Sequence, residues 1–497
     1  MGRRSHEGAE SGPTRPGTGG LGQEGAEASG RGALAELRAI FAGRCVSDDR
    51  KLLDAHSLDQ VGDERYRQRP AAVVFPESTD EIAALMKWAM RTGTPVTPRG
   101  AGSGLAGAAI TVAGGVVCSF QRMNRILEID TQNLMVVVEP GVVTNALDDA
   151  LKPHARFFAG YPMSEDICFI GGNVAENAGG WRAVKYGVTA DYVLGAEVVT
   201  AAGDVLQLGG KRLKDVTGYN LLQLFVGSEG TLGLFTKLII RVVPRPAQRA
   251  VLLSSFAEAR NAAACVSALK REIANPPSAI EFIDGRTARD TTAAMPVAQR
   301  TQLPKDAAAI LLVELDGDAK RDLTGDLEQV AKVCSAAGGR SLESGTNQAA
   351  MDRAWKLRKQ IPWWAKRNAG PWQTHEDVVV PPARVVDLVT VVDELRSHYG
   401  LTIPFFGHAG DGNFHLVPLQ PASMRLEEWA ELIPRLLDDL YDRVAALGGT
   451  ISGEHGIGRK RARYLSQCVG QAQLEVLRSI KRALDPNGIL NPGVVLE

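Results

Sequence analysis

The sequence predicts an α+β protein with more than one domain, and three observations carry this prediction. The first half mixes short apolar strands with amphipathic helices and contains three glycine-rich stretches. The second half alternates strands and helices, as an α/β unit does. Pro244 and Pro246 interrupt strand pairing between the two halves. The length of 497 residues agrees with two to four domains of about 150 residues each.

Four segments follow from these observations. The first 32 residues include ten glycines, four arginines and four glutamates with very few apolar side chains, a composition that cannot offset the entropy of ordering. The acidic residues also argue against an organelle transit peptide. We expect a disordered tail over 1–32, a first domain over 33–246, a second domain over 247–450 and a C-terminal segment over 451–497.

The elements of the first domain are predicted from local patterns. A strand begins at Ala71, and the capping box Ser78–Glu81 opens an amphipathic helix that ends at Gly93. Apolar runs predict further strands over 95–97, 115–120, 134–139, 192–199 and 233–243.

The second domain shows a regular alternation. Strands are expected over 251–256, 279–283 and 308–315, and helices over 257–273 and 322–337. Two more helices, near 382–400 and 425–447, flank a histidine-containing segment.

Composition excludes several classes of function. The 56 basic and 57 acidic residues leave a net charge of −1, so no long-range field favours nucleic acid. The six cysteines are widely spaced and include no CxxC pair for a cluster or zinc. No apolar run approaches the 18 or so residues that a membrane-spanning helix needs. We expect a cytoplasmic protein, either soluble or docked peripherally on the inner face of the membrane.

The first glycine-rich stretch covers 98–109. Its GxGxxG spacing at 102–107 matches the dinucleotide fingerprint, and Glu128 and Asp130 follow about 20 residues later. That fingerprint requires a helix next, whereas 110–120 has strand character. The better interpretation is a loop of consecutive backbone N–H groups that holds phosphate oxygens.

Two further glycine-rich stretches lie in the same domain. The stretch over 171–180 places Asn173 and Asn177 among glycines, so that the backbone can approach a flat ligand closely. The stretch over 226–233 is a third loop that fits either a ligand or a simple strand turn. Three such loops in one domain favour an extended cofactor.

Histidines and one glutamate form a second constellation. The strong turn Gly410–Gly412 lies between His408 and His415, so the two imidazoles can converge. Glu454 follows 39 residues after His415, and two imidazoles with one carboxylate are a common set for a catalytic divalent ion. The adjacent His455 then remains available as a base.

Six motifs taken together resemble the FAD-dependent D-2-hydroxyacid dehydrogenases. They are PRGAGSGLAGA, GGNVAENAGG, KDVTGYNLLQLFVGSEGTLG, GHAGDGNFH, SGEHGIG and LDPNGILNPG. The family includes the glycolate oxidase flavoprotein subunit, cytochrome-type D-lactate dehydrogenase and D-2-hydroxyglutarate dehydrogenase, which have the vanillyl-alcohol-oxidase-type FAD fold. The resemblance covers about 65–497. It implies a two-subdomain FAD-binding domain, an α/β cap domain with an antiparallel sheet, and a C-terminal segment that returns to the flavin.

The resemblance also implies roles for individual residues. The cofactor-binding residues would be Pro98, Arg99, Gly100, Ala101, Gly102, Ser103, Gly104, Gly172, Asn173, Asn177, Gly180 and Asn491. The metal ligands would be His408, His415 and Glu454, with zinc favoured over manganese or iron. The catalytic residues would be His455 as general base, Arg358 for the substrate carboxylate and Asn413 for a further substrate contact. Since no histidine stands between Pro98 and Ala109, we expect noncovalent FAD.

The expected reaction is oxidation of a small D-2-hydroxy acid. His375 precedes Glu376–Asp377 where D-2-hydroxyglutarate dehydrogenases have a lysine, so a monocarboxylate such as D-lactate or glycolate is favoured. Electrons would pass to a cytochrome, a quinone system, an electron-transfer flavoprotein or an iron–sulfur subunit, and a homodimer is expected. The alternatives are a glycolate-oxidising complex subunit inactive alone, a D-2-hydroxyglutarate dehydrogenase, and an alkylglycerone-phosphate synthase-like transferase.

Overall fold

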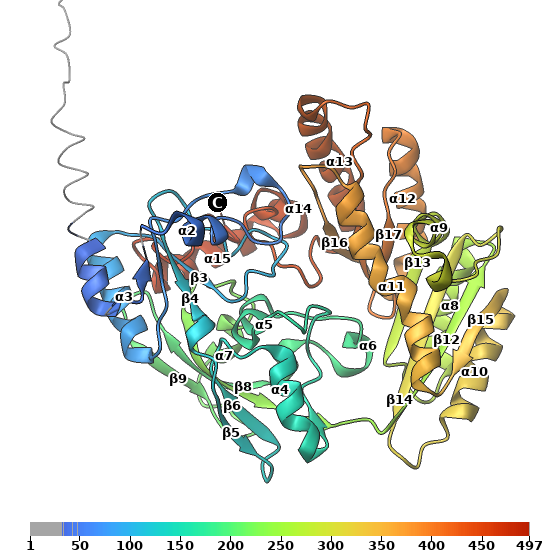
Figure 1. The fold of residues 1–497 in the computed structure, drawn as a ribbon, viewed down its shortest axis with the longest axis horizontal. Coiled ribbons are helices and arrows are strands. Elements are labelled where there is room, and N and C mark those ends of the chain that lie inside the picture. Colours follow the sequence, from blue (N-terminus) through green and yellow to red (C-terminus); the bar gives the residue numbers. More distant parts are fainter. Residues whose placement is uncertain (1–31, 33, 42, 47, 497) are drawn as a thin grey trace, which may run out of the picture.

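The computed structural model describes residues 32, 34–41, 43–46 and 48–496. The tail predicted over 1–32 therefore falls, up to residue 31, outside the described residues. Within the described part, the strands form four sheets, and the helices cover their faces (Figure 1).

The first sheet has the strand order β1-β2-β4-β3 and presents the first glycine loop. Its strands are β1 (Cys45–Val46), β2 (Ala72–Val74), β4 (Val116–Ser119) and β3 (Val96–Arg99). The three strands β2, β4 and β3 are parallel, and the glycine loop leaves the sheet at the end of β3. Helix α3 (Thr79–Thr92) covers this sheet, with the Ser78 hydroxyl as its N-cap and Gly93 at φ +67° as its C-cap, as predicted.

The second sheet is antiparallel and has the order β5-β6-β10-β8-β9. Its strands are β5 (Ile126–Asp130), β6 (Met135–Val138), β10 (Leu234–Arg241), β8 (Val193–Val199) and β9 (Val205–Gly209). A short pair, β7 (Arg156–Phe157) and β11 (Val243–Pro244), lies beside it. The other helices described over 50–225 are α2 (Arg50–Ala55), α4 (Thr144–Leu151), α5 (Ile170–Glu176), α6 (Ala183–Tyr186) and α7 (Leu221–Phe225).

The largest sheet belongs to the second half and has seven strands in antiparallel pairs. In order they are β15 (Gly339–Gly345), β12 (Gln248–Phe256), β14 (Ala309–Gly317), β13 (Ala279–Asp284), β17 (Phe405–His408), β18 (Asn413–Leu416) and β16 (Glu376–Val379). The antiparallel sheet expected for the cap domain is therefore confirmed.

Helices cover both faces of the seven-stranded sheet, and the alternation of side chains along each strand explains why. In β13, Ile280 and Phe282 pack with α8 (Ala259–Glu272), α10 (Leu323–Ala336), α12 (Val385–Tyr399) and α13 (Leu426–Ala446). Ala279 and Ile283 face the other side, under α9 (Gly285–Ala294) and α11 (Gln348–Asn368). Figure 1 shows these helices at the right of the molecule.

The chain returns to the first half after the cap. Helix α14 (Leu465–Cys468) precedes α15 (Gln471–Leu484), and Figure 1 shows α15 on the side of the first two sheets. The Lys481 ammonium donates to the Thr231 carbonyl, and the Val96 amide donates to the Ile489 carbonyl. The last residues of the chain thereby reach the base of the first glycine loop.

One expected loop is a helix. Residues 170–176 of the second glycine-rich stretch form α5, which ends at Asn177 in the left-handed conformation at φ +49°. A Cβ on Gly171 would lie 2.4 Å from the Pro140 Cβ, so this glycine serves the close packing of a helix on a turn. Elements that the patterns did not predict include β5, β15, α9 and the long α11.

Candidate active site

A cavity of about 890 Å³ lies between the two halves, and elements distant in the sequence line it. The first half contributes the first glycine loop, α5 and the Trp181–Arg182 segment. The second half contributes one face of α11 and of the β17–β18 hairpin, and the C-terminal segment contributes Glu454 and His455. The cavity therefore exists only where all three parts meet.

The first glycine loop has the properties of an anion cradle. Within the described residues, the main-chain N–H groups from Gly100 to Leu105 donate no hydrogen bond to a protein atom, and these residues line the cavity. Gly104 has open space where a Cβ would stand. The Arg99 guanidinium donates to the carbonyls of Leu58 and Ala109, so it braces the loop. A row of free donors with open space beside it fits the pyrophosphate of a dinucleotide.

The second glycine-rich stretch divides into residues that line the cavity and residues that do not. Gly172 lines it with open space around its Cα, and Asn173 lines it while donating to the Thr144 hydroxyl at 2.9 Å. Asn177 instead accepts from the Ala190 amide, and Gly180 allows close approach of the Tyr161 carbonyl. The structure thus gives Asn177 and Gly180 packing roles outside the cavity wall.

The β17–β18 hairpin brings the two predicted histidines together. In its register Phe406 pairs with His415 and His408 pairs with Asn413, so these four side chains share one face. The imidazole centroids of His408 and His415 lie 5.3 Å apart. Phe405 and Phe414 stack on the opposite face at 4.7 Å and anchor the hairpin in the core. The turn at Gly412, with φ +82°, connects the two arms as predicted.

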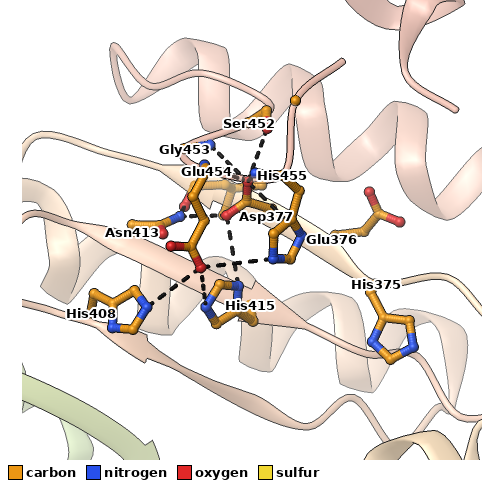
Figure 2. A network of polar contacts seen from close by, with 12 residues as sticks. His375, Glu376, Asp377, His408, Asn413, His415, Ser452, Gly453, Glu454 and His455 are labelled. Carbon is orange, nitrogen blue, oxygen red and sulfur yellow. Dashed lines mark hydrogen bonds and ion pairs between the residues drawn. The ribbon is translucent and has the colours of Figure 1, made fainter. Parts of the chain in front are cut away.

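One carboxylate oxygen faces three imidazoles (Figure 2). Glu454 Oε1 lies 3.5 Å from Nε2 of His408, 3.3 Å from Nε2 of His415 and 3.8 Å from Nε2 of His455. The rings of His415 and His455 stack with an interplanar angle of 8°. The four side chains thus converge on one point at the cavity wall.

Asp377 on β16 holds the segment that carries Glu454 and His455. Its Oδ2 accepts from the Ser452 hydroxyl and from the amides of Gly453, Glu454 and His455 at 2.8–2.9 Å. Its Oδ1 accepts from Asn413 Nδ2 at 2.6 Å. Figure 2 shows this carboxylate surrounded by its donors. Burial raises the pKa of Asp377, but electrostatic attraction by the neighbouring His455, His415 and Arg461 side chains, with the hydrogen bond from Asn413, holds it well below its usual range.

A second carboxylate holds the other end of the same segment. Glu229, in the third glycine loop, accepts from the amides of Ile457 and Gly458 at 2.7 Å each. Asn491 donates to the Glu229 and Ala108 carbonyls, and its side chain is not part of the cavity wall. Asn491 therefore ties two glycine loops together, and its expected flavin contact stays a prediction.

Burial sets the charge of the imidazoles. It lowers the pKa of His415 to about 3 and that of His455 to about 4, so both rings are neutral near pH 7. Burial also opposes a charge on His408, but Glu281 and Glu454 raise the pKa of His408 above its usual range. The neutral Nε2 atoms of His415 and His455 are competent as metal ligands or as proton acceptors, whereas a charged His408 ring must release its Nε2 proton when it binds an ion.

The donor set fits a divalent ion. Two donors bound at about 2.1 Å with a tetrahedral angle lie about 3.4 Å apart, close to the separations of Glu454 Oε1 from His408 and His415. His408 Nε2 is buried and has no hydrogen-bond partner. Ligand atoms of Asp377, His415, Glu454 and His455 lie within 4.8 Å of one another, but five donors already occupy the Asp377 oxygens. His408, His415 and Glu454 could therefore hold the ion, and His455 lies beside them.

The two remaining predicted site residues differ in their placement. Arg358 on α11 lines the cavity, is 1% exposed and lies over the Phe406 ring at 5.0 Å. Asn413 is not part of the cavity wall, because its amide is engaged by Asp377 and the Val378 carbonyl. Asp377 and the Val378 carbonyl therefore fix the Asn413 amide in this structure, and its expected substrate contact stays a prediction.

Sequence reasoning missed four residues that the structure brings to the site. Asp377 and Glu229 hold the C-terminal segment, and Glu281 contacts both His408 and Arg358. Arg182 lines the cavity with its Nε buried and without a partner. An acidic residue within an apolar strand, as in AIEFID around Glu281, was the available signal.

Comparisons with known proteins agree with this architecture. Residues 245–495 match the family model of the C-terminal domain of FAD linked oxidases, and residues 70–209 match that of an FAD binding domain. The chain therefore belongs to the FAD-linked oxidase family, and it is an FAD-linked oxidoreductase.

Two relatives narrow the resemblance. The chain is 37% identical to the glycolate oxidase subunit GlcD of Bacillus subtilis (strain 168) over 86% of this chain and 89% of the relative. It is 34% identical to a D-lactate dehydrogenase of Anaerostipes hadrus over 86% of this chain and 90% of the relative. The predicted resemblance to the D-2-hydroxyacid dehydrogenases is confirmed.

A solved structure confirms the fold. The structure of p-cresol methylhydroxylase with substrate bound superposes with a TM-score of 0.76 and 18% identity, covering 95% of this chain and 98% of the other. The chain thus has the predicted vanillyl-alcohol-oxidase-type fold. Among the described helices, none has the length and apolar character needed to cross a bilayer.

Asp377→Asn tests the hold on the C-terminal segment. An amide has only one acceptor oxygen for the five donors that Asp377 holds. The segment carrying Glu454 and His455 should therefore break its hydrogen bonds to residue 377 more often. We expect hydrogen exchange of the amides at 453–455 to accelerate about tenfold or more. This acceleration corresponds to the free energy of roughly one hydrogen bond to a charged group. Asp485→Asn is the matched control, because Asp485 is also buried and accepts from the amides of Ile489 and Leu490. Unchanged exchange at 453–455 in Asp377→Asn would contradict the role of Asp377.

Proposed function

We propose that this protein is an FAD-dependent dehydrogenase that oxidises a small D-2-hydroxy acid, with D-lactate or glycolate favoured, to the 2-oxo acid. The observation that carries the proposal is the convergence of His408, His415 and Glu454 beside His455 on a cavity lined by the glycine loop. Arg358 on the same wall supplies a cation for the substrate carboxylate.

The two bound groups would supply different chemistry. FAD, held noncovalently by the loop over 98–104 with Gly172 and Asn173, supplies an acceptor for the hydride from C2. A divalent ion on His408, His415 and Glu454, with zinc favoured, supplies a Lewis acid that lowers the pKa of the substrate hydroxyl.

His455 is the proposed general base. Its imidazole is neutral near pH 7 because burial lowers its pKa to about 4, so it can accept the hydroxyl proton. Asp377 Oδ2 lies 4.0 Å from its Nδ1 and favours the protonated ring. The proton therefore has an acceptor whose charge is stabilised by a fixed carboxylate.

The neutral side chain at position 375 supports a monocarboxylate substrate. His375, where relatives acting on 2-hydroxyglutarate were expected to have a lysine, lines the cavity, and burial lowers its pKa to about 3. The nearby Lys460 ammonium is held by Glu376 at 2.8 Å and does not line the cavity. The side chain at position 375 therefore offers no charge to a second substrate carboxylate, and the cation of the cavity wall that acts on His375 is Lys366, which donates to Gln60.

The reduced flavin needs a separate electron acceptor. A cytochrome, a quinone system, an electron-transfer flavoprotein or an iron–sulfur subunit would serve. A second candidate function is that of a flavoprotein subunit that turns over only within a glycolate-oxidising complex. The name of the Bacillus subtilis relative, a subunit of glycolate oxidase, supports that candidate.

Anaerobic reduction of the bound flavin tests the reaction. The FAD-loaded protein supplemented with Zn²⁺ is mixed in turn with D-lactate, glycolate, L-lactate and D-2-hydroxyglutarate, and the oxidised flavin absorbance is followed. We expect rapid bleaching by D-lactate or glycolate, and loss of bleaching after treatment with a chelator. Bleaching that is insensitive to the chelator would overturn the metal-assisted step. Persistent yellow colour with all four acids would favour the subunit candidate.

His455→Ala tests the proton acceptor. Loss of a general base lowers turnover by about 10²–10⁴-fold. FAD content should remain at the wild-type level, because the glycine loop is untouched. His154→Ala is the control, since His154 is exposed in the first half of the chain. Turnover of His455→Ala within a few-fold of wild type would remove His455 from this role.

A further inference from the structure

A buried glutamate in the cap sheet lies behind the candidate site. Glu281 occupies the middle of β13 between apolar neighbours and is fully buried. It is not part of the cavity wall. A buried carboxylate is costly unless charged or hydrogen-bonded partners compensate it, so the partners of Glu281 explain its presence.

Each oxygen of Glu281 has a different partner. Oε1 lies 2.5 Å from Nδ1 of His408, and Oε2 lies 2.5 Å from Nε of Arg358. Strand pairing fixes the first contact, because Glu281 and His408 are direct neighbours across β13 and β17. Helix α11 covers the same face of the sheet and carries Arg358. One carboxylate therefore joins two residues that line the cavity.

The first contact determines which nitrogen of His408 carries a proton. An ionised carboxylate only accepts hydrogen bonds, so Nδ1 of His408 must donate. In the neutral ring the lone pair is then on Nε2, which is buried without a partner and faces Glu454 at 3.5 Å. Carboxylates in this position commonly fix the tautomer of histidines that bind metals.

We propose that Glu281 is a positioning residue that fixes the Nδ1–H tautomer of His408 and, with its other oxygen, the orientation of Arg358. This inference rests on the proposed function for the roles of the two residues. The metal-binding residue and the residue for the substrate carboxylate are thereby set by the same group.

Glu281→Gln should move the proton of His408 from Nδ1 to Nε2. An amide has one acceptor and one donor end, and Arg358, which is always charged, takes the acceptor. The amide NH₂ then faces Nδ1 of His408, which must accept, so the proton of the neutral ring moves to Nε2. A protonated Nε2 cannot bind a metal, and we expect the affinity for Zn²⁺ to fall about 10–100-fold.

Two measurements on the FAD-loaded protein test this consequence. Zn²⁺ affinity is measured by competition with a chelator. Histidine ¹⁵N NMR of the metal-free protein, recorded at a pH high enough to keep the His408 ring neutral and with His408 assigned from its Ala variant, reports whether Nδ1 carries a proton. Nδ1 should be protonated in the wild type and bare in Glu281→Gln. Glu197→Gln is the matched control, because Glu197 is also buried within a strand but lies outside the cavity wall. It should leave both readouts unchanged.

A double variant tests whether one carboxylate serves both partners. When Glu281→Gln is combined with Arg358→Met, the amide oxygen introduced by the first substitution loses its cationic donor and can turn to Nδ1 of His408. The double variant should therefore bind Zn²⁺ about tenfold more tightly than Glu281→Gln alone. It would thus recover part of the Zn²⁺ affinity that the single variant loses when the proton moves to Nε2. A purely structural effect of Glu281→Gln would instead be worsened by the second substitution.

The outcomes separate this inference from the proposed function. Wild-type Zn²⁺ affinity and a protonated Nδ1 in Glu281→Gln would overturn the role of Glu281. If the wild type binds no Zn²⁺, the metal step of the proposed function fails, and the NMR result alone decides the role of Glu281. If Glu281→Gln does not fold, Glu281→Asp tests the proposal instead. The shorter aspartate side chain keeps the carboxylate but cannot reach both His408 and Arg358. Reduced Zn²⁺ affinity then supports the proposal, and unchanged affinity overturns it.

Discussion

The site depends on the capture of one short backbone segment by two buried carboxylates. Asp377 of the cap sheet holds the amides at the start of the segment 452–458, and Glu229 of the third glycine loop holds those at its end. Neither carboxylate could be buried without these donors, and the segment could not hold its course without the carboxylates. Because the two acceptors come from opposite halves of the protein, the segment sets Glu454 and His455 where the halves meet.

Because of this arrangement, the geometry of the site depends on the relative position of the two halves. Further polar contacts join the halves, among them the Tyr186 hydroxyl, which donates to Asp316 of β14 at 2.8 Å, and the Lys366 ammonium, which donates to Gln60 at 2.7 Å. The glycine loop lies on one side of the cavity, while Arg358 and the histidines of the hairpin lie on the other. A cofactor held by the loop and an acid held by Arg358 would therefore meet at His455. Hydrogen bonds suit this contact between the halves, since they fix the relative orientation of the two halves as well as the distance between them.

The features that were predicted correctly depend on short-range chemistry. Helix α3 begins after Ser78 and ends at Gly93, because an N-cap hydroxyl and a left-handed glycine each terminate a helix through contacts within one turn. The turn over 410–412 likewise brings together two histidines that are close in the sequence. The stretch over 171–180 was expected to be a loop, because its glycines were assigned to close approach of the backbone to a ligand. Gly171 instead allows a helix to pack on Pro140.

Long-range pairing accounts for the rest of what the sequence did not reveal. Glu281 reaches His408 across 127 residues through the register of the seven-stranded sheet. Asp377, on the edge strand β16 of that sheet, accepts from the His455 amide across 78 residues. Asn491 likewise holds carbonyls of distant segments. No local pattern encodes such partners.

Anomalous X-ray scattering at the zinc edge tests most directly whether His408, His415 and Glu454 hold a divalent ion beside His455. The crystals would contain the FAD-loaded protein grown with Zn²⁺. We expect one strong peak at bonding distance from Nε2 of His408, Nε2 of His415 and a carboxylate oxygen of Glu454. The absence of a peak there, or a peak bound instead by Asp377, would contradict the proposed metal site.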